Sequence, residues 1–211
     1  MPPARPPHYG SVPGLGEPIR ILAIGESSVC GVGLACGDEA VAAVTARALA
    51  RMTGRPIIWR AHGLSGATVR DARQRLVPRI VPEPADLLIV GFGVNDATAY
   101  RSPAGFADDL VALVTAARRR VGNAAVVIGG VAPLDCFPAL PWPLRIILGW
   151  RSVALQAAAE RLQGRLPKLA VERFSAPFGP ELFASDGFHP NRKAHTLWGE
   201  DIAALALPLL R

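Results

Sequence analysis

Residues 19–28 read IRILAIGESS, a short apolar run that leads into a glycine and then a pair of serines. An apolar run of this length, bounded by a glycine, indicates a buried strand. Residues 86–90 (DLLIV) form a second such run and are followed by Gly91. Near-continuous apolar strands are typical of a parallel sheet that helices cover on both faces. The sequence therefore predicts an α/β fold.

Strand-like and helix-like segments alternate along the rest of the chain. Ser102 directly before Pro103 is typical of a helix start. Because parallel strands are joined by right-handed crossovers, we expect a three-layer α/β/α sandwich with a five-stranded parallel sheet in the flavodoxin-like order 2-1-3-4-5. The predicted strands are 19–24, 57–59, 86–90, 126–130 and 169–174, and the predicted helices are 38–52, 69–80, 102–120, 146–163 and 192–210.

The chain has 211 residues, half of them hydrophobic, a size that suits one domain. We predict a Pro-rich arm over residues 1–18, disordered or loosely docked, and a single domain over 19–211. No run approaches the roughly 20 apolar residues of a membrane-spanning helix. The prolines near the start are unlike a signal peptide, so a cytoplasmic location is expected.

The net charge of +6 raises the question of a nucleic-acid partner. The basic residues are almost all arginines and are scattered, apart from the run 118–120 at the end of a predicted helix, where cations complement the helix dipole. No nucleic-acid motif is present, so a small molecule is the expected partner, of a monomer or weak homo-oligomer. Reduced thiols are expected at the three cysteines, which match no common zinc pattern (Cys30, Cys36 and Cys136).

Polar groups follow the predicted strands at three places. Ser27 comes just after the first strand in a glycine-rich turn, and Asn95 lies just after the strand that ends at Val90. Near the C-terminus, Asp186 precedes His189 by three residues, so its carboxylate can hold the imidazole in one tautomer. The carboxyl ends of parallel strands meet at one edge. A nucleophile, a base and a group that orients the base are the requirements of acyl transfer by a serine.

Read together, these segments resemble the blocks of the GDSL, or SGNH, hydrolase family. The family's nucleophile block Gly-Asp-Ser-Leu corresponds to residues 25–28, and its glycine loop to 65–68. The Gly-x-Asn-Asp block corresponds to 93–96, and the Asp-x-x-His-Pro block to 186–190. The order of the blocks is the family's, from about Ile19 to the C-terminus.

The resemblance implies the SGNH hydrolase fold and a carboxylic ester hydrolase that needs neither a metal nor an organic cofactor. Ser27 would be the nucleophile, with Asp186 and His189 completing the catalytic triad. The oxyanion hole would be formed by the N–H groups of Ser27 and Gly66 and the side-chain amide of Asn95.

Three departures from the family pattern are visible. Glu26 replaces the usual aspartate and Ser28 the usual leucine, and Ala61 and His62 stand where the family often has an asparagine. Because Glu26 is one methylene longer than aspartate, any hydrogen bonds beneath the nucleophile must be rearranged.

Residues 133–150 combine four prolines with large apolar side chains. We interpret residues 137–150 as an acyl pocket or flap for short to medium acyl chains, with ordinary core under a long loop as the alternative. Other functions also stay open: an acyltransferase, a sugar O-acetylesterase, or a non-catalytic domain that binds acyl ligands or a membrane surface through 140–150. The pocket residues predicted are Phe137, Leu140, Trp142 and Ile146.

Overall fold

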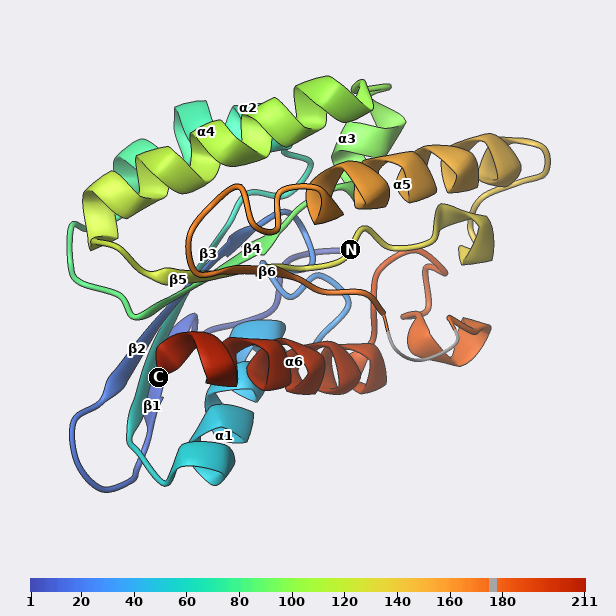
Figure 1. The fold of residues 1–211 in the computed structure, drawn as a ribbon. Coiled ribbons are helices and arrows are strands. Elements are labelled where there is room, and N and C mark those ends of the chain that lie inside the picture. Colours follow the sequence, from blue (N-terminus) through green and yellow to red (C-terminus); the bar gives the residue numbers. More distant parts are fainter. Residues whose placement is uncertain (175–177) are drawn as a thin grey trace.

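The computed structural model describes residues 1–174 and 178–211, and shows a twisted sheet between two layers of helices (Figure 1). The six-stranded sheet has the order β1-β3-β2-β4-β5-β6. The strands are β1 (Tyr9–Val12), β2 (Ile19–Gly25), β3 (Ile57–Gly63), β4 (Leu87–Gly91), β5 (Ala125–Ile128) and β6 (Leu169–Val171). The α-helices are α1 (Val41–Thr53), α2 (Val69–Arg75), α3 (Val94–Thr98), α4 (Pro103–Val121), α5 (Leu144–Glu160) and α6 (Arg192–Ala206).

The five predicted strands form the parallel part of the sheet. Strands β3, β2, β4, β5 and β6 are neighbours in that order and all pair in parallel. Counted along the chain from β2, this is the order 2-1-3-4-5, so the predicted α/β/α architecture is confirmed.

The N-terminal segment is not the disordered or loosely docked arm that its prolines suggested. Tyr9–Val12 forms β1, which pairs antiparallel with β3 as a sixth, edge strand. Ala4 is buried, and its N–H donates to the carbonyl of Cys30 at 3.1 Å. The prolines lie outside β1, where they leave its ladder of hydrogen bonds intact.

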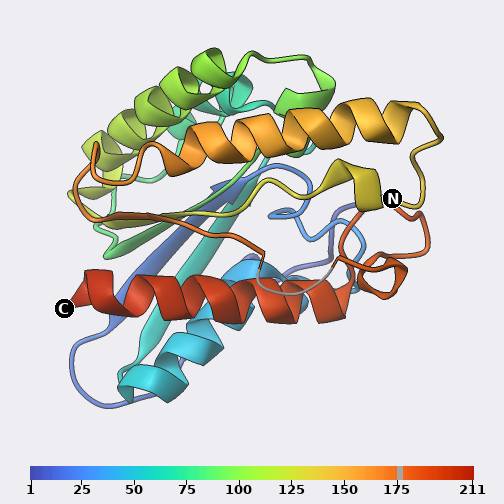
Figure 2. The same ribbon diagram turned by 45° about the vertical axis from the view of Figure 1, so that its right-hand side comes forward.

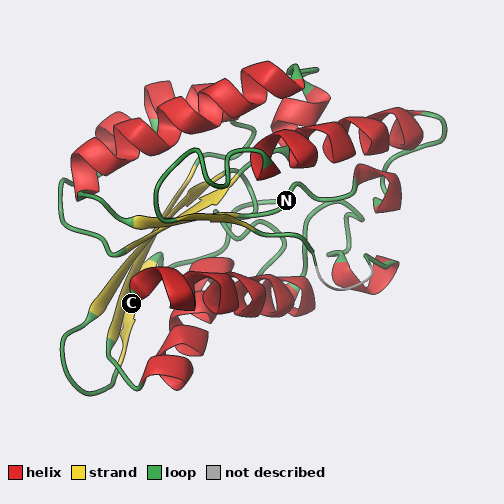
Figure 3. Ribbon diagram, in the orientation of Figure 1, coloured by secondary structure: helices red, strands yellow, loops and turns green. Residues whose placement is uncertain are grey.

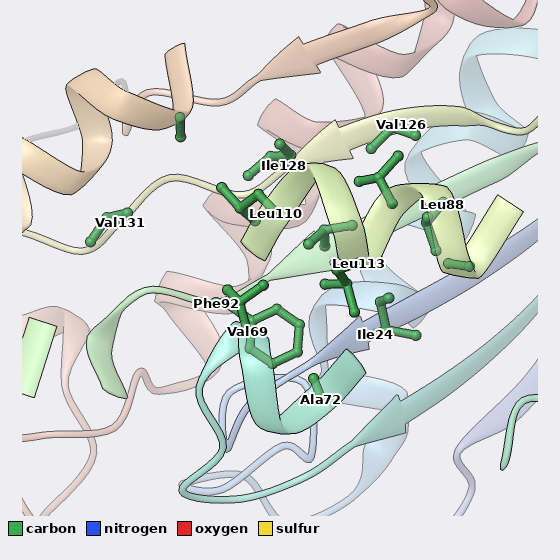
Figure 4. Packing of buried hydrophobic residues seen from close by; sticks show 14 of the residues in the cluster. Ile24, Val69, Ala72, Leu88, Phe92, Leu110, Leu113, Val126, Ile128 and Val131 are labelled. Atoms are coloured by element: carbon green, nitrogen blue, oxygen red, sulfur yellow. The ribbon is translucent and has the colours of Figure 1, made fainter. Parts of the chain in front are cut away.

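Figure 3 shows helices on both sides of the sheet. Alternate strand residues belong to two different hydrophobic clusters. Ile21 and Ala23 pack toward α1 and α6, whereas Leu22 and Ile24 pack toward α2, α4 and α5. Figure 4 shows the hydrophobic cluster that contains Ile24, in which Leu110 and Leu113 of α4 lie over the strands. Strands buried on both faces explain the near-continuous apolar runs in the sequence.

Some elements differ from the prediction in their bounds. The helix predicted over 69–80 ends at Arg75 and is followed by a 3₁₀ turn, Val77–Arg79. The α-helix ends there because Pro78 lies in this turn and proline removes a helical hydrogen bond. The short helix α3 was not predicted; it begins directly after Gly93, whose φ of 140° favours glycine. No helix among residues 1–174 and 178–211 is long and apolar enough to cross a membrane.

The carboxyl group of Glu172, just after β6, is buried beside the end of β5. Its Oε2 atom accepts the N–H of Gly130 at 2.6 Å, whereas Oε1 has no hydrogen-bond partner among residues 1–174 and 178–211. Burial raises the pKa of Glu172 to about 7, against the effect of the Gly130 N–H, and the charge of Asp201 adds to the rise. Below about pH 7 the folded state therefore holds a proton that the unfolded chain loses near pH 4.5.

This difference predicts a pH dependence of stability. Between the ordinary glutamate pKa of 4.5 and about 7 the folded protein binds more protons than the unfolded chain, so the free energy of unfolding falls as the pH rises. We expect Glu172→Gln to lose less stability than the wild type between about pH 5 and pH 8, as measured by urea denaturation.

Glu181→Gln, which makes the same change at an exposed position, is the control and should follow the wild type. If the free energies of unfolding of Glu172→Gln and the wild type change equally with pH, Glu172 is ionised in the folded state throughout this range.

Candidate active site

The loop after β2 places Ser27 at the carboxyl edge of the sheet. The N–H groups of Val29 and Cys30 donate to the carbonyl of Glu26 at 3.1 and 3.2 Å, and the N–H of Val32 donates to that of Ser27 at 3.0 Å. These bonds close a compact turn immediately after the strand. Ser27 is partly exposed and lines a cavity at this edge.

Asp186 and His189 form the hydrogen-bonded pair that their spacing predicted. Asp186 Oδ2 lies 2.7 Å from His189 Nδ1, and Oδ1 accepts the N–H groups of Phe188 and His189 at 3.0 and 2.9 Å. Burial alone would raise the pKa of Asp186, but these hydrogen bonds outweigh it and lower the pKa to about 2. An ionised carboxylate only accepts, so Nδ1 carries the imidazole proton and Nε2 is left as a proton acceptor.

The fold brings His189 to the same cavity as Ser27. Asn191 caps α6 through a hydrogen bond from the N–H of Ala194 at 3.1 Å, which fixes the chain just after the histidine. Gly33, in the loop that follows Ser27, lies against the same segment. A Cβ atom there would come 2.9 Å from the carbonyl oxygen of Pro190 and 3.3 Å from His189 Cβ.

Asn95 lies beside the nucleophile loop, in the first turn of α3. Its side-chain amide donates to the carboxylate of Glu26 and, at 3.2 Å, to the carbonyl of Ala67. Neither Asn95 nor Gly66 is among the residues that line the cavity, whereas the neighbouring Val94 is. The structure therefore holds Asn95 next to the cavity with its amide bonded to protein acceptors.

Gly66 lies in the exposed loop between β3 and α2, with a φ of 76°. This loop meets the nucleophile strand, because the N–H of Leu64 donates to the carbonyl of Gly25 at 2.9 Å. The carbonyl of Ala67, one residue after Gly66, accepts from the Asn95 amide. All four sequence blocks thus lie at one edge of the sheet.

Glu26, where the family has an aspartate, is a buried carboxyl group under this edge. Its oxygens accept the N–H groups of Val94 and Asn95, both at 3.1 Å, as well as the Asn95 amide. Burial raises the pKa of Glu26 to about 8, even though these hydrogen bonds lower it. The carboxyl group of Glu26 thus connects the residue before Ser27 to the start of α3.

The cavity beside Ser27 and His189 is aromatic. The indole of Trp198 on α6 and the side chains of Ala132 and Leu182 add to its apolar wall. Several of the phenylalanine rings meet edge to face, in a chain that ends on the His189 imidazole. Six of the seven phenylalanines of the protein line this cavity: Phe92, Phe137, Phe174, Phe178, Phe183 and Phe188.

Only one of the four residues predicted for the acyl pocket lines this cavity. Phe137 is buried and lines the cavity, but Leu140, Trp142 and Ile146 do not. Leu140 packs against the core, and Trp142 is 75% exposed just before α5 begins. The chain leaves the cavity after Phe137 and turns outward.

The sequence did contain a sign of the true lining. Phe174, Phe178, Phe183 and Phe188 recur every four or five residues in the segment that leads to His189. Spacing alone does not show on which side of an irregular segment a side chain lies, so these residues were not identified. Within residues 1–174 and 178–211, no group of three or more histidine, cysteine or acidic side chains is arranged to hold a metal ion.

Comparison with known proteins agrees with this geometry. The model of the GDSL-like lipase/acylhydrolase family matches residues 23–197. The GDSL-like esterase Rv1075c of Mycobacterium tuberculosis is 32% identical over 198 residues, which is 90% of this chain and 62% of the relative's length. The chain therefore spans less than two thirds of that relative.

Solved structures show the same fold at lower identity. The structure of TesA has a TM-score of 0.69 at 21% identity and covers 90% of this chain and 99% of its own. Est24 is described as a carbohydrate acetylesterase from Sinorhizobium meliloti. Its structure has a TM-score of 0.64 at 17% identity and covers 90% of this chain and 99% of its own. The family model matches the chain from within β2 into α6, and the four blocks lie at one sheet edge. The chain therefore belongs to the GDSL-like lipase/acylhydrolase family.

Proposed function

We propose that this protein is a serine esterase that hydrolyses carboxylic esters through an acyl-enzyme on Ser27. The observation that carries the proposal is the hydrogen-bonded pair of Asp186 and His189. The ionised Asp186 carboxylate lies 2.7 Å from His189 Nδ1, and His189 lines the same cavity as Ser27. With Nδ1 bonded to Asp186, Nε2 is the nitrogen of His189 that would act as the base toward Ser27 in this proposal.

In the proposed reaction, Ser27 Oγ attacks the ester carbonyl while His189 Nε2 takes its proton. Asp186 stabilises the imidazolium that forms. The imidazolium then protonates the leaving alkoxide, and an alcohol departs. Water, deprotonated by His189, attacks the acyl-enzyme, and the proton returns to Ser27 as the acid is released.

The oxyanion of each tetrahedral intermediate would be met by the N–H groups of Ser27 and Gly66 and the amide of Asn95. Glu26 and the carbonyl of Ala67 hold that amide in place. Both N–H groups of that amide are thus donated to protein acceptors, so one of them must be released from Glu26 or Ala67 to meet the oxyanion.

The aromatic cavity supports an acyl group of short to medium length as the preferred substrate. Each buried methylene contributes about 0.8 kcal/mol, until the acyl chain fills the cavity. A sugar O-acetylesterase is the less favoured alternative, since the lining by phenylalanine offers few hydrogen bonds to sugar hydroxyl groups. An acyltransferase, which replaces water by another alcohol, uses the same residues.

A non-catalytic acyl-binding domain is the alternative from a different class. Such a domain would need the aromatic cavity but not the Asp186–His189 pair. The two functions differ in whether Ser27 is required for turnover.

Replacing Ser27 tests the nucleophile. We expect Ser27→Ala to abolish hydrolysis of p-nitrophenyl esters and to leave the circular dichroism spectrum unchanged, because the side chain is partly exposed at a strand end. Ser28→Ala is the matched control, since Ser28 lines the same cavity one residue later and should retain turnover. Wild-type rates in a pure Ser27→Ala preparation would remove Ser27 from the mechanism.

Replacing Asn95 tests the oxyanion role. Loss of one such donor typically costs about 10²–10³ in turnover, so Asn95→Ala should lower kcat far more than it raises KM. Thr98→Ala, an exposed change on the same short helix, is the control. An effect confined to KM would mean that Asn95 positions the substrate only.

Replacing Gly33 tests the placement of His189. Gly33→Ala puts a Cβ atom against Pro190 and His189, so we expect kcat to fall, by up to about 10² if the imidazole moves by about 1 Å. Gly16→Ala is the control, because Gly16 also has a positive φ (88°) but open space around it. Equal kcat values in the two variants would show that the loop tolerates the contact.

The acyl cavity is tested with a series of p-nitrophenyl esters. Activity should rise with acyl-chain length and then fall, and Phe178→Ala should move the optimum to longer chains by enlarging the cavity. Trp142→Ala should leave the optimum unchanged, because that side chain lies outside the cavity. A shift with Trp142→Ala and none with Phe178→Ala would reverse this assignment.

A further inference from the structure

The N-terminal half of α5 and the residues before it carry an unusual concentration of exposed apolar side chains. Trp142 is 75% exposed, Trp150 72% and Val153 65%, and the nearby Tyr100 is 61% exposed. We call this surface the α5 face; it consists of Tyr100, Trp142, Leu144, Ile147, Trp150 and Val153.

Helix geometry separates the α5 face from the core. Leu144, Ile147, Trp150 and Val153 follow one another at intervals of three residues and are exposed. The residues that α5 turns inward are small or aliphatic: Leu148, Gly149, Ser152, Leu155, Ala158 and Ala159. Tyr100, Ile147 and Trp150 line one groove, which joins these three residues of the face between α5 and the residues that follow α3. Contiguous exposed apolar surface marks an interaction site.

The charged side chains within residues 136–159 are positive, and the exposed Asp135 lies just outside this range, next to Gly149. Residues 136–159 contain no aspartate or glutamate, and their only charged side chains are Arg145 and Arg151. Arg145 is exposed. The Arg151 guanidinium lies 4.6 Å from the centre of the Tyr100 ring and donates to the carbonyl oxygens of Ala97 and Arg101 at 2.9 and 2.8 Å. Both acceptors are neutral carbonyl groups, so these hydrogen bonds do not neutralise the positive charge of Arg151.

The face lies close to the cavity. The segment between them is short: Phe137 lines the cavity, and the N–H of Ala139 donates to the carbonyl of Gly187 at 3.0 Å. In Figures 1 and 2 the N-terminal end of α5 and the 3₁₀ turn at 180–182 project on the same side of the molecule. An object that contacts the face is therefore next to the Asp186–His189 loop.

We propose that the α5 face docks the protein onto an anionic lipid surface. Tryptophan and tyrosine favour the boundary between headgroups and acyl chains, and a helix with exposed apolar residues and arginines binds anionic membranes through both terms. A second copy of this chain fits less well. A two-fold interface would bring the arginines of the two faces together without a carboxylate from residues 136–159 to pair them.

The test uses the tryptophans of the protein itself. Trp59 and Trp198 are buried, whereas Trp142 and Trp150 are exposed, so an environment-dependent shift of the fluorescence spectrum on docking comes from the α5 face. We expect a blue shift and co-sedimentation with vesicles of 70% phosphatidylcholine and 30% phosphatidylglycerol. Binding to pure phosphatidylcholine should be weaker, and added salt should weaken the binding to anionic vesicles.

Two sets of variants locate the contact. The double variant Trp142→Ser with Trp150→Ser should bind anionic vesicles at least tenfold more weakly, and Arg145→Gln about fivefold more weakly. The control is Tyr9→Ser with Leu15→Ser, which removes two exposed apolar side chains from the N-terminal segment and should bind like the wild type. Unchanged binding in the tryptophan variant, or no binding by the wild type, would overturn the proposal.

Two further measurements separate the alternatives. Sedimentation velocity should show the same mass for the wild type and the tryptophan variant; a dimer that only the wild type forms would identify the face as an interface between copies and overturn lipid docking. The vesicle assays need no catalysis and can be repeated with Ser27→Ala. Failure of the esterase assignment would therefore leave membrane binding intact, and failure of membrane binding would leave esterase activity intact.

Discussion

The register of three parallel strands is the constraint on which the site depends. Gly25 pairs with Gly63 on one side and with Gly91 on the other, so β2, β3 and β4 end at one level, each on a glycine. A Cβ atom on Gly25 would lie 2.6 Å from the carbonyl oxygen of Gly91. The chain can therefore turn sharply after Gly25, and the N–H of Glu26 bonds across to Gly91 at 3.0 Å. This turn presents Ser27 at the sheet edge.

Glu26 connects this edge to the neighbouring elements. Its buried carboxyl group accepts N–H groups from the start of α3, and the Asn95 amide bridges it to the carbonyl of Ala67. The nucleophile turn, the Gly66 loop and the asparagine thus form one hydrogen-bonded unit. In contrast, the Asp186–His189 loop reaches the site through packing, against Gly33 and along the chain of phenylalanine rings. A substrate in the aromatic cavity would press on the same rings that support the histidine.

The sequence predicted the parts of this structure that depend on local pattern. Apolar runs ending in glycine predicted the parallel strands, and the spacing of Asp186 and His189 predicted their hydrogen bond. It did not predict the reach of Glu26, because that depends on the packing of α3, a helix of five residues without a clear periodic pattern. Tyr9–Val12 was missed as a strand because prolines surround it and its pairing with β3 is non-local.

The acyl cavity shows a second limit. Residues 133–150 looked like pocket lining because they are apolar and proline-rich, but only tertiary packing decides which side of such a segment faces inward. Phe137 turns to the cavity and Trp142 to solvent, five residues apart. The same outward turn that removes Trp142 from the cavity creates the exposed face on α5.

The central claim is that Ser27 is a nucleophile activated by His189. The most direct measurement is reaction with a fluorophosphonate, followed by intact-mass and peptide mass spectrometry. The account predicts one adduct per chain, located on Ser27 and not on the adjacent Ser28, absent in Ser27→Ala and formed much more slowly in a folded His189→Ala variant. An adduct on Ser28, or labelling of Ser27 at the same rate without His189, would contradict it.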